Sequence, residues 1–451
     1  MHDQEAVGGL LPQPKQRVSK PACQWDGPRN QSDGIQKLPG CPRSVSSRLR
    51  RKLKTGRCTE PALAKWRVVL PAPMAYPLEQ GCIHQHPLAV FASPGRYVQG
   101  PGATHELARE LKRLGLAGSV LFIAGGTAQR LLAPIWQAEL PPLGLTPVIE
   151  AFGGECSKAE IVRLVDLANN HPFAAVVGAG GGKASDTARA VANELELPVV
   201  ITPTLASTDS PCSALSVLYS DQGEMLSYRF YTRHPELVLV DTTVIAQAPK
   251  RQLVAGLGDA LATWFEARTV RQSHANNQLW GKPTTTGTAL AKLCHDILLT
   301  DGPAACSAVD AGVATPALER IVEANNLLSG LGFECGGLAA AHAVNNGFSM
   351  IAGSHGMLHG EKVAMGLHTQ LVLEGQPQAE IHDIFEYCQR VGLPTTLAQL
   401  GVNANSDEDI HSIAERAVMA EETIHNEPFE ITAEAVACAL KAADQQGRAY
   451  V

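Results

Sequence analysis

The sequence predicts an α/β domain followed by an all-helical domain. Two observations predict this order. From about residue 93, short apolar runs alternate with amphipathic helical segments, a pattern typical of a parallel sheet with helices on its faces. After Pro249 the strand-like runs stop, and from Arg251 onward the segments are rich in Ala, Leu and Glu with helical spacing.

The periodicity places each element of the first domain in turn. The expected helices and strands are helix Thr104 to Leu114, strand Ser119 to Ala124, strand Thr146 to Phe152, helix Lys158 to Asn170, strand Ala174 to Gly178, helix Ala184 to Leu195, strand Pro198 to Thr202, a hairpin of Ala214 to Tyr219 with Met225 to Phe230, and strand Leu237 to Val240. We divide the chain into a basic extension (1–88), an α/β domain (89–248) and a helical domain (249–451).

Charge sets the extension apart from the rest. Residues 1–70 carry a balance of +9, whereas the whole chain carries −7. This segment is rich in Pro, Gly, Ser and Gln and has no sustained apolar period, so we interpret it as a disordered tail or a gene start placed too early, with Met74 as the alternative start. A nucleic-acid arm or a targeting peptide is the alternative, but Asp3 and Glu5 are atypical of a transit peptide.

Composition excludes several classes of protein. No stretch of eighteen apolar residues is present, and no secretory signal opens the chain, so we expect a soluble, cytoplasmic protein without a membrane partner. The acidic remainder of the chain argues against nucleic-acid binding. The eleven cysteines are scattered and form no C-x-x-C pair, which favours reduced thiols.

A glycine-rich turn follows the expected strand at residues 174–178. In Gly178-Ala-Gly180-Gly181-Gly182-Lys183 the chain passes directly from a strand into a helix, which would point free backbone N–H groups at an anion. The spacing matches neither G-x-G-x-x-G nor a P-loop. It predicts a phosphate-bearing ligand, although a tight strand-to-helix turn alone would have the same sequence.

A run of hydroxyl side chains follows the next strand, from Thr202 to Ser213. Open α/β sheets bind ligands at the carboxyl ends of their strands, so Asp209 in this run is a candidate for binding a substrate hydroxyl. A Ser/Thr-rich turn that caps a helix is the alternative.

Asp259, His342 and His359 are the candidate metal ligands. We expect Asp259 at the start of a helix, His342 in a helical stretch of small residues, and His359 beside Gly360 in an unusual turn. Two histidines and a carboxylate from separate elements would leave room for substrate, as a catalytic zinc requires. Any one of them taken alone is more simply a core or surface residue.

Together these segments resemble the glycerol dehydrogenases, within the iron-containing alcohol dehydrogenase and dehydroquinate synthase superfamily. The resemblance is carried by Ser93 to Gly100, Phe152 to Ser157, the glycine loop, Ser207 to Val217, Gly258 to Ala267, Gly336 to Gly347, His359 to Lys362 and Glu422 to Asn426. It implies a Rossmann-like nucleotide-binding domain, a helical metal-binding domain and a homo-oligomer.

The resemblance also implies a role for individual residues. Gly182, Lys183 and Asp186 match the pyrophosphate loop of NAD, to which we add Gly180 and Gly181. The residues that match the nicotinamide side are Thr204, Ser207, Ser213, Leu215 and Tyr219. Asp209 matches a substrate-binding aspartate, and Asp259, His342 and His359 match three zinc ligands.

The implied reaction is oxidation of glycerol, a small polyol, to dihydroxyacetone. Zinc, as a Lewis acid, would favour the alkoxide of the secondary hydroxyl, and hydride would pass from that carbon to NAD. Asp209 and a water chain are both candidates for accepting the proton. The iron-dependent branch has a histidine one turn after the aspartate, where this chain has Thr263, so zinc is favoured over iron.

Two departures from the family pattern change these expectations. Gly125 replaces an aspartate that would contact the adenosine ribose, so we expect poorer discrimination between NAD and NADP. Asn345 replaces a second histidine of the A-H-A-x-H-N-G motif, and we expect that it does not bind the metal.

The alternatives to a glycerol dehydrogenase are a dehydrogenase of another vicinal diol or of glycerol phosphate, a dehydroquinate-synthase-like lyase using NAD transiently, or a non-catalytic protein with the same fold.

Overall fold

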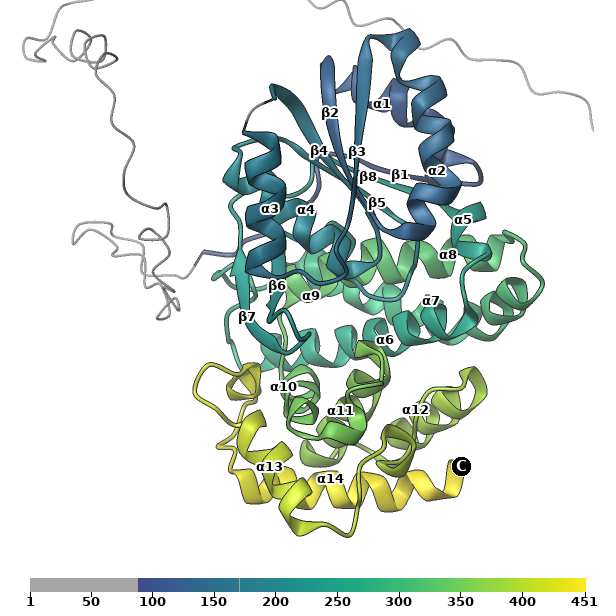
Figure 1. Cartoon of the computed structure of the whole chain (residues 1–451). Helices are drawn as coiled ribbons and strands as arrows, with labels where there is room; N and C mark the ends of the chain where they lie inside the picture. Colours follow the sequence, from purple (N-terminus) through teal and green to yellow (C-terminus); the bar gives the residue numbers. More distant parts are fainter. Residues whose placement is uncertain (1–87, 170) are drawn as a thin grey trace, which may run out of the picture. The chain divides into compact units, whose positions relative to one another are not determined.

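The computed structural model describes residues 88–169 and 171–451. The predictions for residues 1–87 lie outside this range. Within it, a parallel sheet occupies the first half and helices the second, as Figure 1 shows. The predicted fold class is therefore confirmed.

The parallel sheet has six strands in the order β1-β8-β5-β4-β2-β3. Its strands are β1 (Tyr97–Gly100), β2 (Gly118–Ala124), β3 (Leu145–Ala151), β4 (Phe173–Gly180), β5 (Val199–Pro203) and β8 (Leu237–Asp241). Strands β6 (Leu215–Tyr219) and β7 (Met225–Phe230) form a separate antiparallel pair, as expected. The β1 strand was not predicted from the sequence.

Helices cover both faces of the sheet. Those of the first half are α1 (Leu107–Arg113), α2 (Gly126–Glu139), α3 (Lys158–Ala168), α4 (Gly182–Glu194) and α5 (Thr242–Ala246), with 3-10 turns at Ala103–Glu106, Pro141–Leu143 and Ser210–Cys212. Along β2, Val120 and Phe122 pack with α1 and α2, whereas Leu121 and Ile123 pack with α3 and α4. Successive strand residues therefore face opposite layers, and both layers are apolar.

The second half is helical throughout, as predicted. Its helices are α6 (Lys250–Gln272), α7 (Thr285–Asp310), α8 (Pro316–Glu323), α9 (Ser329–Gly336), α10 (Ala340–Gly347), α11 (His359–Leu373), α12 (Gln378–Val391), α13 (Asp407–Ala417) and α14 (Ala433–Gly447). A π-helical turn, Ala324–Leu328, joins α8 to α9. Short 3-10 turns lie at Phe348–Met350, Ala352–Ser354, Ala398–Leu400, Thr423–Asn426 and Arg448–Tyr450.

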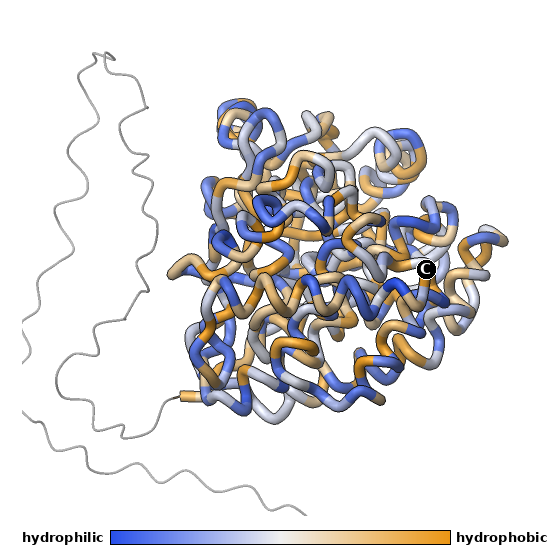
Figure 2. Tube along the Cα trace, turned by 90° about the horizontal axis from the view of Figure 1, so that it is seen from below, coloured by the Kyte–Doolittle hydropathy of each residue, from blue (hydrophilic) through white to orange (hydrophobic). Residues whose placement is uncertain are grey.

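Hydrophobic and polar residues are interspersed along the chain near its C-terminus, as Figure 2 shows. Buried residues of α6 and α7 join the α3 and α4 face of the sheet in one hydrophobic cluster. Because this cluster runs through sheet and helices alike, the domain division at residues 248 and 249 stays a prediction.

Among the described helices, no single one has the length and apolar content needed to cross a membrane. One pair, Pro316–Gly336 with Ala340–Met350, meets these criteria only when its two members are taken together, across a bend of 102°.

Candidate active site

The glycine-rich turn connects β4 to α4 at the carboxyl end of the sheet. A Cβ at Gly178 would lie 2.5 Å from Ala188 Cβ, and one at Gly180 would lie 2.8 Å from Ala184 Cβ, so glycine lets the helix pack close to its strand. Helix α4 begins at Gly182, two residues earlier than predicted, and no side chain caps its first N–H groups. These groups and the positive end of the helix suit an anion.

The turn lies where the order of the strands reverses. From β2 the chain goes outward to β3 and then returns to β4 on the other side of β2. Gly125, at the end of β2, donates its N–H to the Ala179 carbonyl of β4 (2.9 Å). Two glycine-rich helix starts, those of α2 and α4, therefore lie at the switch point of the sheet, the place where such folds bind nucleotides.

Lys183 is held beside this turn by two side chains. Its ammonium lies 2.6 Å from both oxygens of Glu155 and 4.6 Å from the centre of the Tyr219 ring. The structure thus brings together Lys183 and Tyr219, both predicted from the sequence. Glu155 was not predicted, because nothing in its local sequence marks it as a partner of a residue 28 positions away.

Asp186 lies inside the protein rather than at its surface. Its carboxylate accepts hydrogen bonds from Arg189 (2.6 Å) and from the backbone N–H of Val217 (3.1 Å). Burial raises its pKa to about 6, although Arg189 opposes the shift. Both oxygens are thus engaged within the protein, joining α4 to β6.

The hydroxyl-rich run follows β5 and lies against the glycine turn. The Thr204 N–H donates to the Gly180 carbonyl (2.9 Å), and a Cβ at Gly182 would lie 3.3 Å from the Thr208 hydroxyl oxygen. The other predicted members are Ser207, which is half-buried, Ser213, whose hydroxyl donates to the Ser210 carbonyl (2.9 Å), and Leu215, which is buried at the start of β6.

The three candidate metal ligands converge from three helices. Asp259 lies within α6, His342 in the first turn of α10, and His359 is the first residue of α11. Asp259 Oδ1 lies 3.4 Å from His342 Nε2 and 3.1 Å from His359 Nε2. One ligand atom from each residue lies within 4.8 Å of the other two, and this is the only such group among the described residues.

Two of the local predictions for this site are wrong. Asp259 does not start its helix, since α6 begins nine residues earlier at Lys250. Gly360 does not form an unusual turn but allows α11 to approach α6: a Cβ on it would lie 1.7 Å from the Ala255 carbonyl oxygen. A Cβ on Gly258 would similarly lie 2.3 Å from the Gly360 carbonyl oxygen. The two helices meet backbone to backbone, which places His359 beside Asp259.

The atoms at the centre of this cluster suit a divalent cation. Asp259 Oδ1 is buried and has no hydrogen-bond partner. His342 Nδ1 donates to Glu266 Oε2 at 2.5 Å, so Nε2 is the nitrogen that points at Asp259. The His359 side chain is 40% exposed, which leaves one side of the cluster open. A carboxylate oxygen and two imidazole nitrogens with an open side are the ligands of a catalytic site.

The charges agree with this assignment. Burial alone would raise the pKa of Asp259, but His359 and His342 outweigh it and hold that pKa below its usual range. Burial opposes protonation of His342, yet Glu266 and Asp259 raise its pKa well above the ordinary value. The cluster therefore favours positive charge at the His342 Nε2 position, and a bound cation would replace that proton.

Asp209 lies directly beside the cluster. Its backbone N–H donates to Asp259 Oδ2 (3.1 Å), and its Oδ2 accepts from the Ser329 hydroxyl (3.0 Å). Ser329 also shares a hydrogen bond of 2.7 Å with Thr263. Burial and the neighbouring Asp259 carboxylate raise the Asp209 pKa well above its ordinary value. A group of this kind can exchange hydrogen bonds with a substrate hydroxyl.

Glu266 and Ser329 were not predicted from the sequence. A signal for Glu266 existed, because it follows Asp259 by two helical turns and so shares its face of α6. Ser329 carried no signal, since it comes from another helix. Asn345, the residue that departs from the family motif, is buried and donates to Asn346 (3.2 Å).

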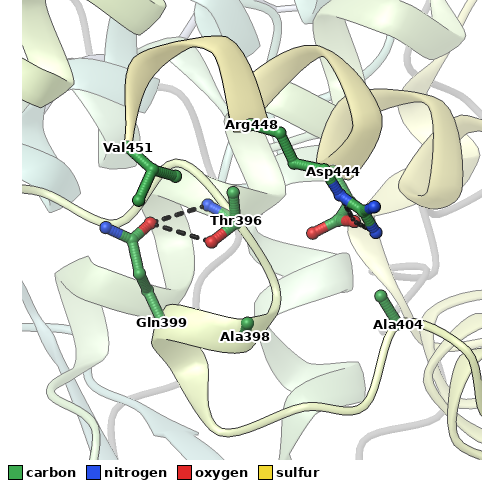
Figure 3. A pocket seen from close by; sticks show the side chains of 7 residues that line it. All are labelled: Thr396, Ala398, Gln399, Ala404, Asp444, Arg448 and Val451. Carbon is green, nitrogen blue, oxygen red and sulfur yellow. Dashed lines mark hydrogen bonds and ion pairs between the residues drawn. The ribbon is translucent and has the colours of Figure 1, made fainter.

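A separate hollow near the C-terminus lacks comparable chemistry. It encloses about 400 Å³ and is lined by Thr396, Ala398, Gln399, Ala404, Asp444, Arg448 and Val451. Figure 3 shows its polar groups bonded to one another, with Gln399 accepting from Thr396 and Arg448 paired with Asp444. We therefore assign no function to this hollow.

Comparison with known proteins finds similarity to one family model and to several glycerol dehydrogenases. Residues 94–242 match the family model described as iron-containing alcohol dehydrogenase. A glycerol dehydrogenase of Thermotoga maritima is 50% identical over 355 residues, covering 79% of this chain and 96% of the relative. A glycerol dehydrogenase of Pseudomonas putida is 49% identical, covering 80% of this chain and 98% of the relative.

Among solved structures, a probable glycerol dehydrogenase from Sinorhizobium meliloti aligns with a TM-score of 0.75 at 41% identity. The alignment covers 80% of this chain and 99% of that structure.

Proposed function

The chain belongs to the iron-containing alcohol dehydrogenase family, in which it matches the glycerol dehydrogenases, and we propose that it oxidises glycerol at its secondary hydroxyl with reduction of NAD. The reaction converts glycerol and NAD⁺ into dihydroxyacetone, NADH and a proton. The observation that carries the proposal is the convergence of Asp259, His342 and His359 in one cluster, which is buried at Asp259 and open to solvent at His359. Identity to glycerol dehydrogenases of up to 50% supports glycerol over the lyase alternative.

We assign the cofactor to the switch point of the sheet. The N–H groups at the start of α4, from Gly181 to Lys183, would bind the diphosphate, and the ammonium of Lys183 would add one positive charge. Thr204, which follows β5, and Tyr219, at the end of β6, contact this turn and would line the nicotinamide side of the site. The Asp186 carboxylate would act indirectly, by fixing β6 against α4.

Asp259, His342 and His359 would hold the metal, and the ion would act as a Lewis acid that lowers the pKa of the substrate hydroxyl. Asp209 would orient the substrate through a hydrogen bond to a hydroxyl, itself fixed by Ser329. Bound NAD would supply the hydride acceptor for C2 of glycerol, and Asp209 or water would take the proton of the substrate hydroxyl.

Zinc is the proposed metal. Thr263 occupies the position on α6 one turn after Asp259, and its hydroxyl is engaged with Ser329, so three side chains of the described residues are placed to bind the ion. Three ligands and an open side are typical of catalytic zinc. Assembly into a homo-oligomer and a cytoplasmic location stay predictions.

Metal removal tests the proposal. The purified protein would be stripped with a chelator, and NADH formation from glycerol and NAD would be followed by near-ultraviolet absorbance before and after adding Zn²⁺ or Fe²⁺. We expect activity to vanish and to return best with Zn²⁺. Asp259→Asn should abolish the recovery, whereas His411→Gln, at an exposed pair with Glu415, should not. Absence of NADH from glycerol and related diols with both metals would contradict the proposal.

A further inference from the structure

We propose that Glu266 is the positioning residue of the metal centre: it keeps the proton of His342 on Nδ1 and so leaves Nε2 free to bind the ion. This inference rests on the proposed function, because it assumes a metal at Asp259, His342 and His359. Glu266 would touch neither the metal nor the substrate, and it would act through His342 alone.

The imidazole of His342 is enclosed between two carboxylates from one helix. Asp259 and Glu266 are seven residues apart on α6 and therefore lie on the same face, two turns from each other. Glu266 Oε2 lies 2.5 Å from Nδ1, and Asp259 Oδ1 lies 3.4 Å from Nε2. Because a single rigid helix carries both groups, it fixes the rotation of the ring as well as its position.

Glu266 also holds the backbone that carries His342. Its Oε1 accepts the N–H of Ala339 (2.8 Å) and that of His342 (3.1 Å), at the start of α10. No local side chain caps this helix, so a carboxylate from α6 takes that part. The Glu266 carboxylate thus lies at the positive end of α10 and accepts hydrogen bonds at both of its oxygens.

This arrangement requires a carboxylate and excludes the isosteric amide. Glutamine has one accepting oxygen, whereas Glu266 accepts from two backbone N–H groups and from the imidazole. If the amide oxygen stays on the backbone groups, the amide nitrogen donates to Nδ1 and moves the ring proton to Nε2, the atom that must bind the metal. If the amide turns over, its NH₂ opposes the two backbone N–H groups.

Glu427 provides a matched control. It binds the N–H of Ala340 (3.3 Å), in the same first turn of α10, but no contact joins it to the imidazole. Burial and the neighbouring Glu374 raise its pKa to about 9, so it is neutral near pH 7 and resembles glutamine. Glu427→Gln is therefore the same substitution at the same helix end without the effect on His342.

The test compares metal binding by Glu266→Gln, Glu427→Gln and the unaltered chain. Zinc affinity would be measured by competition with a chromogenic chelator, and ligation by the visible absorption of the Co²⁺-loaded protein. We expect Glu266→Gln to bind Zn²⁺ about 10- to 100-fold more weakly, as is typical for the loss of a hydrogen bond to a metal-bound histidine, and to change the Co²⁺ spectrum. Glu427→Gln should keep the affinity and spectrum of the unaltered chain.

Equal zinc affinity and an unchanged Co²⁺ spectrum in Glu266→Gln would overturn this inference while the proposed function stands. Failure of the unaltered chain to bind either metal, with no NADH from glycerol, would overturn both. If Glu266→Gln does not fold, the structure of the zinc-loaded unaltered chain decides. An ion on Nε2 with Glu266 on Nδ1 supports the inference, and Glu266 bound directly to the ion overturns it.

Discussion

Replacing Glu155 by glutamine is expected to tighten NAD binding. In the structure the Glu155 carboxylate lies 2.6 Å from the ammonium of Lys183, the cation next to the proposed diphosphate site. A diphosphate at the start of α4 would compete with this carboxylate for the same charge. Glu155→Gln removes the competitor and keeps the size of the side chain.

The exposure of the pair limits the size of the effect. The side chains of Lys183 and Glu155 are 40% and 30% exposed, so water screens their attraction. Half-exposed ion pairs contribute about 0.2 to 1 kcal/mol, and release of this pair should therefore lower the dissociation constant of NAD by about 1.5- to 5-fold. The turnover number should change little, because the hydrogen bonds of the Glu155 carboxylate go to Lys183 rather than to a proposed metal ligand.

Calorimetric titration of NAD into the unaltered chain and the variant would measure the difference. Glu194→Gln is the control, because Glu194 forms an ion pair of similar exposure with Arg229 outside the proposed cofactor site. Weaker NAD binding by Glu155→Gln would show that Glu155 orients Lys183 rather than competing for it, and would refute the reasoning.

Three further predictions concern stability, metal binding and substrate binding. Burial lowers the pKa of His368 to about 3, below the ordinary value of about 6.5. As the pH falls, the unfolded chain therefore takes up a proton on this imidazole before the folded chain does. Below pH 6, this residue should lower the free energy of unfolding by about 1.4 kcal/mol for each pH unit. Urea titrations at several pH values measure that slope, and His368→Leu should flatten it. Gly360→Ala should weaken zinc binding more than tenfold by forcing α11 from α6, whereas Gly356→Ala, with no atom near its Cβ, should not. Ser329→Ala removes the hydrogen bond that orients Asp209 and should raise the KM for glycerol about fivefold, the equivalent of about 1 kcal/mol, with a smaller change in kcat; an unchanged KM would contradict the substrate role of Asp209.

Local periodicity was sufficient to predict most of the sheet. Strand β4 is apolar throughout and β8 is apolar up to its last residue, Asp241, because helices cover both of their faces, and such runs are recognisable in a sequence. Strand β1 escaped prediction because its four residues are only half-buried and show no alternation. Helix α2 was missed as well, since it opens on Gly125 and Gly126 and contains Pro134.

Less of the active site than of the sheet could be predicted from the sequence. Asp259, His342 and His359 were found because they match family motifs, while their convergence depends on contacts between helices far apart in the chain. Glu155 and Ser329 act only through such contacts, at separations of 28 and 120 residues from their partners. Spacing within one segment carries no information about them.

Deuterium transfer most directly tests the claim that hydride passes from the secondary carbon of glycerol to NAD. Glycerol labelled with deuterium at C2 would be incubated with NAD and the zinc-loaded protein, and the nicotinamide product examined by mass spectrometry and proton NMR. A dehydrogenase predicts one deuterium in each NADH formed, one dihydroxyacetone per NADH, and loss of both with Asp259→Asn. NADH without deuterium, or consumption of glycerol with no accumulation of NADH, would contradict hydride transfer from the secondary carbon.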